Sequence, residues 1–143
     1  MRRDGSFWHE GVRVTHPRLA AALRAGVRWS EPEGTFVVQL AHFRGWLDVE
    51  DTAFFVESYD AGTGEIEISD RTREPLDART LTADPDDAFR CTVKGRFPAR
   101  FTHAAQEHLL AAVEVDGDDV SIRAGAAKLR LPRVLTQGAV AKW

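Results

Sequence analysis

A chain of 143 residues with 43% hydrophobic and 29% charged residues has the composition of a folded protein, which excludes wholesale disorder. It is long enough for one ordinary domain or two very small ones, and it needs no disulfide or metal to fold. The formal net charge of −3, the pI of about 5.9 and the scattered basic residues argue against a protein that binds nucleic acid.

The cysteine content and the absence of long apolar runs bear on the compartment. Cys91 is the single cysteine, so the chain cannot form an internal disulfide, which favours a reducing compartment. No apolar run of signal length follows residues 1–5, and no stretch approaches the roughly 18 apolar residues of a membrane span. We therefore expect a cytoplasmic protein that does not bind a membrane.

The first half of the chain, residues 1–60, is predicted to contain a hairpin, a short helix and four strands. Pro17 is a favourable first residue for the helix, and Gly26 ends it about ten residues later. Three apolar residues recur at helical spacing and form a stripe along the helix: Leu19, Ala22 and Leu23. The extended segments are a hairpin over 6–14 and strands over 27–29, 35–40, 45–49 and 53–59.

The second half, residues 61–143, is predicted to begin with a strand over 65–69, where apolar and polar residues alternate. A long polar loop with two prolines follows at 70–87 and is the best place for a boundary between the halves. Thr102 caps a second helix, whose core-facing residues would be Ala105, Leu109 and Ala112. The remaining segments are a strand over 89–93, a hairpin across 116–118, a strand over 128–131 and a C-terminal tail.

A short motif occurs twice, 87 residues apart, as Arg13-Val14-Thr15-His16 and Arg100-Phe101-Thr102-His103. Each copy ends an extended segment and opens a short helix. Each helix carries a leucine at the same offset, Leu23 and Leu110, and a hairpin follows it. We therefore predict an α+β, strand-rich fold with an internal duplication. Each of its two similar halves would pack a short helix on antiparallel strands, and a single barrel or half-barrel is the alternative.

Several stretches of this chain resemble the bacterial family called domain of unknown function 1285 (DUF1285). They are Phe7-Trp8-x-x-Gly11, the segment Val49-Glu50-Asp51-x-x-Phe54-x-Val56, and, in the second half, Val93-Lys94 and Ala99-Arg100-Phe101. The resemblance covers roughly residues 5–131 in order, and the V-E-D-x-x-F core is its most specific part.

The resemblance implies a duplicated, strand-rich fold whose second half is similar to pleckstrin-homology domains. It also implies a nucleotide-like ligand at the interface between the halves and a role in signalling. No reaction is established for the family, so the resemblance implies binding rather than catalysis.

The acidic residues Asp48, Glu50 and Asp51 are the first candidate site. If they lie on a strand, Asp48 and Glu50 share one face, where two carboxylates could bind a cation or pair with arginines of the other half. The alternative is a solvated strand face with no function. Trp46, just before this cluster, is a candidate platform on which a ligand could stack.

The two copies of the repeated motif are the second candidate site. Arg13, His16, Arg100 and His103 would converge if the halves pack about a pseudo-twofold axis. Two arginines and two helix N-termini would then form a phosphate cradle. The alternative is that the threonines only cap the helices and the arginines pair with nearby carboxylates.

Other chemistries have little support in the sequence. His103 and Glu107 could share a helix face, but a zinc site needs at least three protein ligands, so we predict no metal site and no cofactor. Neither a nucleophile motif nor a phosphate loop is present. Cys91 lies in an alternating strand, where a free cysteine usually acts as a small buried apolar residue.

We therefore expect a non-enzymatic small-ligand-binding or signalling accessory protein. Its ligand would be nucleotide-like, would carry phosphate and would lie in the crevice between the two halves. The alternatives are a protein–protein interaction module with no small-molecule ligand and a hydrolase that uses the carboxylates. An interaction module should expose an apolar patch and lack a deep pocket, whereas a hydrolase should hold one carboxylate with a strongly raised pKa in a cleft.

Overall fold

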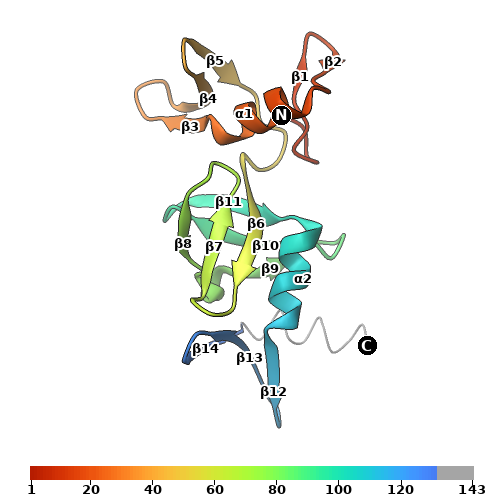
Figure 1. The fold of residues 1–143 in the computed structure, drawn as a ribbon, viewed down its shortest axis with the longest axis vertical. Helices are drawn as coiled ribbons and strands as arrows, with labels where there is room; N and C mark the ends of the chain where they lie inside the picture. Colours follow the sequence, from red (N-terminus) through yellow and green to blue (C-terminus); the bar gives the residue numbers. More distant parts are fainter. Residues whose placement is uncertain (132–143) are drawn as a thin grey trace. The chain divides into compact units, whose positions relative to one another are not determined.

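The computed structural model describes residues 1–131, which divide into two compact units (Figure 1). Unit 1 consists of residues 1–54 and the short segment 69–71, and unit 2 consists of residues 55–68 and the chain from residue 72 onward. This division comes earlier in the chain than the boundary drawn from the sequence at residue 60. The tail predicted for the last ten residues lies outside the described residues.

Unit 1 begins with the predicted hairpin, which turns at Glu10 and Gly11. Both residues have positive φ values, 50° and 81°, as a type I′ turn requires. The elements of unit 1 are β1 (Trp8–His9), β2 (Val12–Arg13), α1 (Pro17–Ala25), β3 (Val27–Ser30), β4 (Thr35–Leu40) and β5 (Phe43–Leu47).

Helix α1 has the predicted ends, but its apolar stripe is not buried. Pro17 is its first residue and Gly26 its C-cap, as the sequence predicts. No residue of α1 is buried, and Leu19 is 44% exposed, so the apolar stripe is not covered by the core. The helix instead approaches the sheet through its C-terminal end, where the Gly26 carbonyl accepts a hydrogen bond from the Gln39 N–H at 2.8 Å.

The strands β3, β4 and β5 form an antiparallel meander in that order. Its core consists of Val27, Val37 and Val38, each at most 4% exposed, and the rings of Trp29 and Phe36 meet edge to face at 5.0 Å. Strand β4 has the predicted bounds, whereas β5 ends at Leu47 and not at residue 49.

Unit 2 is built on a six-stranded sheet among the described residues, in the order β8-β7-β6-β11-β10-β9. Strand β6 begins with three buried residues, Phe54, Phe55 and Val56, as their apolar run predicts. The strands are β6 (Phe54–Asp60), β7 (Glu65–Ile68), β8 (Arg73–Pro75), β9 (Thr82–Ala83), β10 (Phe89–Val93) and β11 (Phe97–Phe101).

The segment 70–87 is more ordered than the long loop expected from its polarity. It contains β8, β9 and a 3₁₀ turn, η1 (Ala78–Thr80). Leu76, Ala78 and Leu81 are each at most 6% exposed. These few apolar residues anchor the segment to the core at intervals too irregular to show a strand or helix period in the sequence.

Helix α2 (His103–Ala111) covers part of the sheet of unit 2, and a second meander follows it (Figure 1). The Thr102 side chain caps the helix by accepting from the Ala105 N–H at 3.2 Å, as predicted. The three residues expected to face the core are all buried: Ala105, Leu109 and Ala112. The meander consists of β12 (Val113–Asp116), β13 (Asp119–Ala124) and β14 (Ala127–Arg130).

A nine-residue helix followed by a three-stranded meander thus occurs in each unit. In both, the helix C-cap carbonyl accepts from the middle strand: Gly26 from Gln39, and Ala112 from the Arg123 N–H at 2.9 Å. The fold is therefore α+β and strand-rich, as predicted. The common origin of the two halves and the likeness of the second to pleckstrin-homology domains stay predictions.

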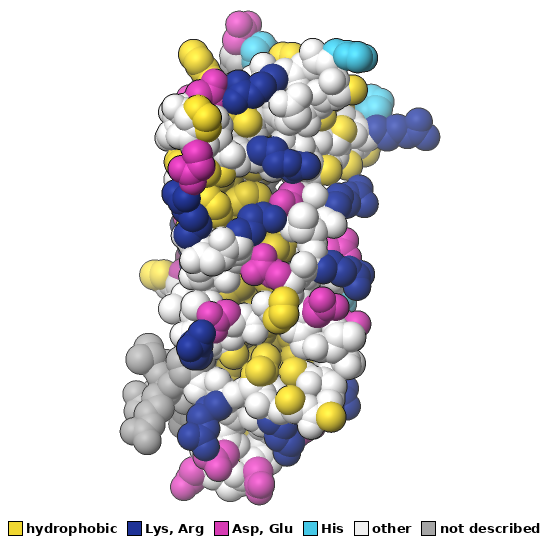
Figure 2. Space-filling view, turned by 90° about the vertical axis from the view of Figure 1, so that its left-hand side faces the viewer, with side chains coloured by type: hydrophobic (Ala, Val, Ile, Leu, Met, Phe, Trp, Pro, Cys, Tyr) yellow, Lys and Arg dark blue, Asp and Glu magenta, His cyan; other side chains and the backbone are white. Residues whose placement is uncertain are grey.

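Basic and acidic side chains are interspersed over the face of the molecule displayed in Figure 2. That face shows no concentrated basic surface of the kind a duplex-binding protein uses.

Candidate functional site

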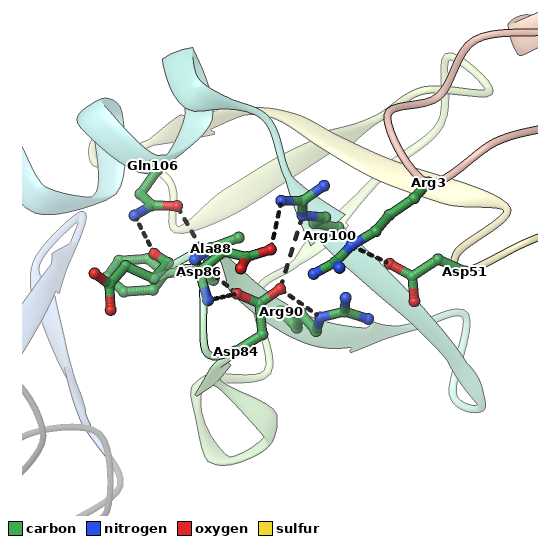
Figure 3. A network of polar contacts seen from close by, with 10 residues as sticks. Arg3, Asp51, Asp84, Asp86, Ala88, Arg90, Arg100 and Gln106 are labelled. Carbon is green, nitrogen blue, oxygen red and sulfur yellow. Dashed lines mark hydrogen bonds and ion pairs between the residues drawn. The ribbon is translucent and has the colours of Figure 1, made fainter.

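A tightly hydrogen-bonded loop connects β9 to β10 in unit 2, and Asp84 organises it (Figure 3). The Oδ1 atom of Asp84 accepts from the N–H groups of Asp86 and Ala88, both at 3.0 Å. The Asp84 N–H donates to the Ala88 carbonyl, also at 3.0 Å. Aspartate favours such turns because its short side chain reaches backbone N–H groups two to four residues along the chain.

Helix α2 holds the same loop through Gln106. The Oε1 atom of this side chain accepts from the Phe89 N–H at 3.1 Å, and its Nε2 donates to the Asp87 carbonyl at 2.7 Å. Asp87 has a φ of 67°, a conformation that aspartate tolerates better than most residues. The loop is therefore held at both ends, by Asp84 from within and by Gln106 from the helix.

Two arginines lie directly opposite each other on the neighbouring strands, Arg90 on β10 and Arg100 on β11. The Nε of Arg90 donates to Asp84 Oδ2 at 3.2 Å. Arg100 lies farther away, with its Nε 3.8 Å from the same oxygen and its Nη2 4.0 Å from Asp86 Oδ2. One carboxylate, only 8% exposed, is thus shared by two guanidinium groups that are 22% and 21% exposed.

The electrostatics keep Asp84 ionised. Burial alone would raise the pKa of its carboxyl, but the hydrogen bonds from the Ala88 N–H, the Arg90 side chain and the Asp86 N–H outweigh burial and lower that pKa below 3.8. A permanent negative charge therefore faces both guanidinium groups at neutral pH and fixes their positions.

Arg100 is the less satisfied of the two arginines. Its contacts with Asp84 and Asp86 are ion pairs longer than a hydrogen bond, and its buried Nε forms no hydrogen bond with any described residue. A guanidinium carries five N–H donors in a planar fork that matches the oxygens of a phosphate or carboxylate. Arg100 is therefore the side chain of this cluster with hydrogen-bonding capacity that its protein contacts do not use fully.

The other candidate site residues of the repeated motif, Arg13, His16 and His103, lie on exposed surfaces. His103 is 90% exposed at the start of α2, and its Nε2 lies 3.0 Å from Glu107 Oε1. Arg13 is exposed on β2, opposite Trp8 in the hairpin. His16 is the N-cap of α1, where its Nδ1 accepts from the Leu19 N–H at 3.3 Å.

The motif copies also differ in how they start their helices. Thr102 is the cap in the second copy, but in the first copy the cap is His16 and not Thr15, one position later in the motif. Arg13 and His16 belong to unit 1 and Arg100 to unit 2, so the convergence of the four motif residues stays a prediction.

The acidic segment does not form the strand face that the sequence suggested. Strand β5 ends at Leu47, so Asp48 and Glu50 lie beyond it and the argument from strand alternation is wrong. Their backbones instead hold Met1: the Asp48 carbonyl accepts from the Met1 amino group at 2.7 Å, and the Glu50 N–H donates to the Met1 carbonyl at 3.0 Å. Asp51 forms an ion pair with Arg3 at 3.7 Å.

Two further candidate residues have clear environments. Trp46 is 80% exposed on β5, and its role as a ligand platform stays a prediction. Cys91 is 3% exposed on β10, as its alternating sequence predicts. Burial, together with the carboxylates of Glu74 and Asp77, raises the pKa of its thiol to about 12, so it is no nucleophile at neutral pH.

An open cavity of about 450 Å³ lies elsewhere in unit 2, between α2 and the sheet. Ser58, Glu65, Glu67 and His108 are among its lining residues, and none of the residues predicted from the sequence lines it. Within residues 1–131, no group of three His, Cys, Asp or Glu side chains could hold a metal ion.

The sequence analysis identified Arg100 but not the other residues of this cluster, which are its ion-pair partners Asp84 and Asp86, its cross-strand neighbour Arg90, and Gln106, which holds the loop. The run Asp84-Pro85-Asp86 is typical of a turn, and that signal was available in the sequence. The cross-strand pairing of Arg90 with Arg100 could not be predicted from the sequence, because it depends on the register set by the turn around Gly95.

The fold and the site define a strand-rich α+β protein with an arginine pair anchored by a buried carboxylate. No protein-family model matches the chain, and no curated protein matches it. None of the helices in residues 1–131 has the length and apolar character needed to cross a membrane.

Two solved structures are similar to this chain, and both are DUF1285 family proteins. The one from Silicibacter pomeroyi DSS-3 has a TM-score of 0.61 and 16% sequence identity, over 96% of this chain and 80% of that one. The one from Shewanella baltica OS155 has a TM-score of 0.50 and 13% identity, over 77% of this chain and 87% of that one. The chain therefore has the fold of DUF1285 family proteins, and the resemblance drawn from its sequence is confirmed. Neither description states an enzymatic activity.

Proposed function

We propose that this chain is a non-enzymatic accessory protein that binds a phosphate-bearing, nucleotide-like ligand through Arg90 and Arg100. One observation carries the proposal. Arg100 is a largely buried cation whose guanidinium forms ion pairs at 3.8 and 4.0 Å and whose buried Nε forms no hydrogen bond with a described residue. Donors left in this state cost free energy, and an anion that accepts from them recovers it.

The neighbourhood of Arg100 supports a site of fixed geometry. Both arginines project from paired strands, and Asp84 holds them through an ionised and nearly buried carboxylate. Preorganised guanidinium groups lose less side-chain entropy when they bind a phosphate than flexible surface residues do.

The chemistry of the described residues supports binding rather than catalysis. Cys91 is buried with its pKa raised to about 12. Asp84 has a pKa below its usual value, opposite to the raised pKa that a carboxylate acting as a general acid needs. This argument supports an accessory role that depends on ligand binding.

A thermal-shift screen tests the proposal, with AMP, ATP, cyclic di-AMP and sugar phosphates as probes. A ligand at about 100 times its dissociation constant should stabilise the fold by roughly 2.7 kcal/mol, which raises the melting temperature by several degrees. The shift should disappear in Arg100→Gln. It should persist in Arg79→Gln, which removes the same charge from a side chain that is 89% exposed.

The same screen separates this proposal from its alternative. A shift that Arg100→Gln leaves intact would place the ligand elsewhere and contradict the role of the arginine pair. No shift with any probe would contradict the proposal as a whole and favour an interaction module that binds no small molecule.

A further inference from the structure

Strand β5 forms one edge of the meander in unit 1, and its outer side carries unused hydrogen-bonding groups. The Gln39 N–H points toward β3, because it donates to the Gly26 carbonyl. In an antiparallel pair, residues alternate between facing one neighbour and the other. Gln39 and Val37 therefore face β3, and the residues of β5 opposite them, Arg44 and Trp46, direct their N–H and C=O groups away from β4.

The side chains of β5 give this edge a distinct character. Trp46 is 80% exposed and Phe43 is 57% exposed, which is a large apolar surface for a five-residue edge strand. The strand has neither the lysine nor the proline with which natural edge strands avoid pairing with other chains. An edge of this kind is suited to pair with another strand.

The sequence of β5 is complementary to itself. In an antiparallel pair of two β5 strands centred on Gly45, Arg44 lies opposite Trp46 of the partner subunit, and Trp46 lies opposite Arg44 of the partner subunit. These are the residues whose backbone groups point outward, so the two pairs would form four hydrogen bonds between the chains. A guanidinium beside an indole ring also forms a favourable cation–π contact.

Two further features fit the same register. The two Gly45 residues would meet on the axis, where opposite strands approach most closely and side chains crowd most. The Phe43 ring already lies against Gly45, since a Cβ on that glycine would lie 2.9 Å from Phe43 Cζ. Arg44 forms an ion pair with Glu33, with 2.5 Å between Nη2 and Oε2. The positive charges of the two Arg44 side chains are therefore balanced, and they do not repel each other strongly when two copies associate.

We propose that the chain forms a twofold symmetric dimer in which β5 pairs antiparallel with β5 of a second copy, centred on Gly45. The two meanders would join into a continuous six-stranded sheet. This inference goes beyond the ligand-binding proposal, since it uses unit 1 and requires no ligand.

The test is the oligomeric state of the full chain, measured by sedimentation equilibrium from about 1 µM to 1 mM, a range that covers weak and moderate dimers. We expect a concentration-dependent dimer for the unchanged chain. Trp46→Lys should make it a monomer, because it places an amine opposite Arg44 of the partner subunit. Val115→Lys is the matched control, since it alters a 70% exposed apolar residue on β12, and it should leave the dimer intact.

A mixing experiment tests the register. Arg44→Glu and Trp46→Lys should each weaken self-association, but an equimolar mixture of the two variants should recover a dimer. In that mixed pair, the introduced carboxylate lies opposite the introduced amine, and the other cross-strand pair stays native. Thermal melts of each variant check that the fold is retained.

A monomer across the whole concentration range would overturn the proposal, as would a dimer that survives Trp46→Lys. Failure of the mixed pair to recover would overturn the register centred on Gly45. None of these outcomes depends on the thermal-shift screen, so the dimer and the phosphate site succeed or fail separately.

Discussion

The two carboxylate oxygens of Asp84 contact different partners. Oδ1 accepts from two backbone N–H groups of the loop, and Oδ2 faces the guanidinium groups of Arg90 and Arg100. The loop and the arginine pair are therefore coupled through one side chain, and a change at Asp84 should affect both.

Asp84→Asn tests this coupling. The amide keeps one oxygen for the loop but removes the charge that faces Arg90 and Arg100, and Arg100 keeps only its 4.0 Å ion pair with Asp86. We expect the free energy of unfolding at pH 7 to fall by about 1–3 kcal/mol, measured by urea denaturation. Asp86→Asn is the control, because Asp86 is 56% exposed and should change stability by less than about 0.5 kcal/mol. Equal effects of the two substitutions would contradict the role given to Asp84.

The pKa of Asp84 also predicts a pH dependence. Because the pKa of this carboxyl in the folded protein lies below its usual 3.8, the unfolded chain binds protons more readily as the pH falls. The stability that Asp84 contributes is therefore present above pH 3.8 and is lost as the pH falls through the lower, folded pKa. Urea denaturation between pH 6 and pH 3 should show a smaller loss of stability for Asp84→Asn than for the unchanged protein. An identical loss would contradict the lowered pKa.

Cys91 should be unreactive in the folded protein. It is 3% exposed and the pKa of its thiol is raised to about 12, so neither access nor thiolate is available at pH 8. We expect a thiol reagent such as DTNB to label it only as the protein unfolds, with a rate that rises with added urea. Rapid labelling without denaturant would contradict the burial of β10.

At the scale of elements, the contact between α1 and its meander depends on Gly26. A Cβ at this position would collide with the Gln39 carbonyl oxygen, which is backbone and cannot easily move away. We expect Gly26→Ala to reduce the free energy of unfolding by about 1–3 kcal/mol, as overpacking does elsewhere, measured by chemical denaturation.

Gly62→Ala is the control for that substitution. Its added Cβ would meet only a movable side-chain oxygen, that of Asp60, at 3.1 Å, so the stability should change little. If Gly26→Ala were as stable as this control, the close approach of helix and strand would be contradicted.

Local sequence signals predicted those elements that local chemistry determines. Strands β4 and β10 and the start and end of α1 agree with the sequence because β-rich runs, a proline and a glycine mark them. The same signals failed where tertiary contacts decide. Strand β5 ends before the acidic residues, and the polar segment 70–87 is anchored by a few buried apolar side chains.

The candidate site, too, could be predicted only where a local sequence pattern marks a residue. Arg100 was found through a repeated motif, but its neighbours Arg90 and Asp84 come from a strand and a loop whose pairing no local pattern specifies. Cross-strand register is fixed by turns and by the packing of a whole sheet, which a single sequence without relatives does not reveal.

At the scale of the whole molecule, each unit pairs a nine-residue helix with a meander, but the two units differ in their exposed features. The meander of unit 1 ends in the exposed aromatic edge of β5, and the helix of unit 2 clamps the loop beside the arginine pair through Gln106. Taken together, the two proposals assign ligand binding to unit 2 and pairing with a second copy to unit 1.

The most direct test of the central claim is a side-chain NMR titration that follows the arginine Nε–Hε signals as AMP, ATP or cyclic di-AMP is added. The account predicts that the signals of Arg90 and Arg100 shift in a saturable way with at least one probe, while the signal of the exposed Arg79 does not shift. If Arg90 and Arg100 do not respond to any probe, or shift only together with Arg79, the arginine pair is not a phosphate-binding site.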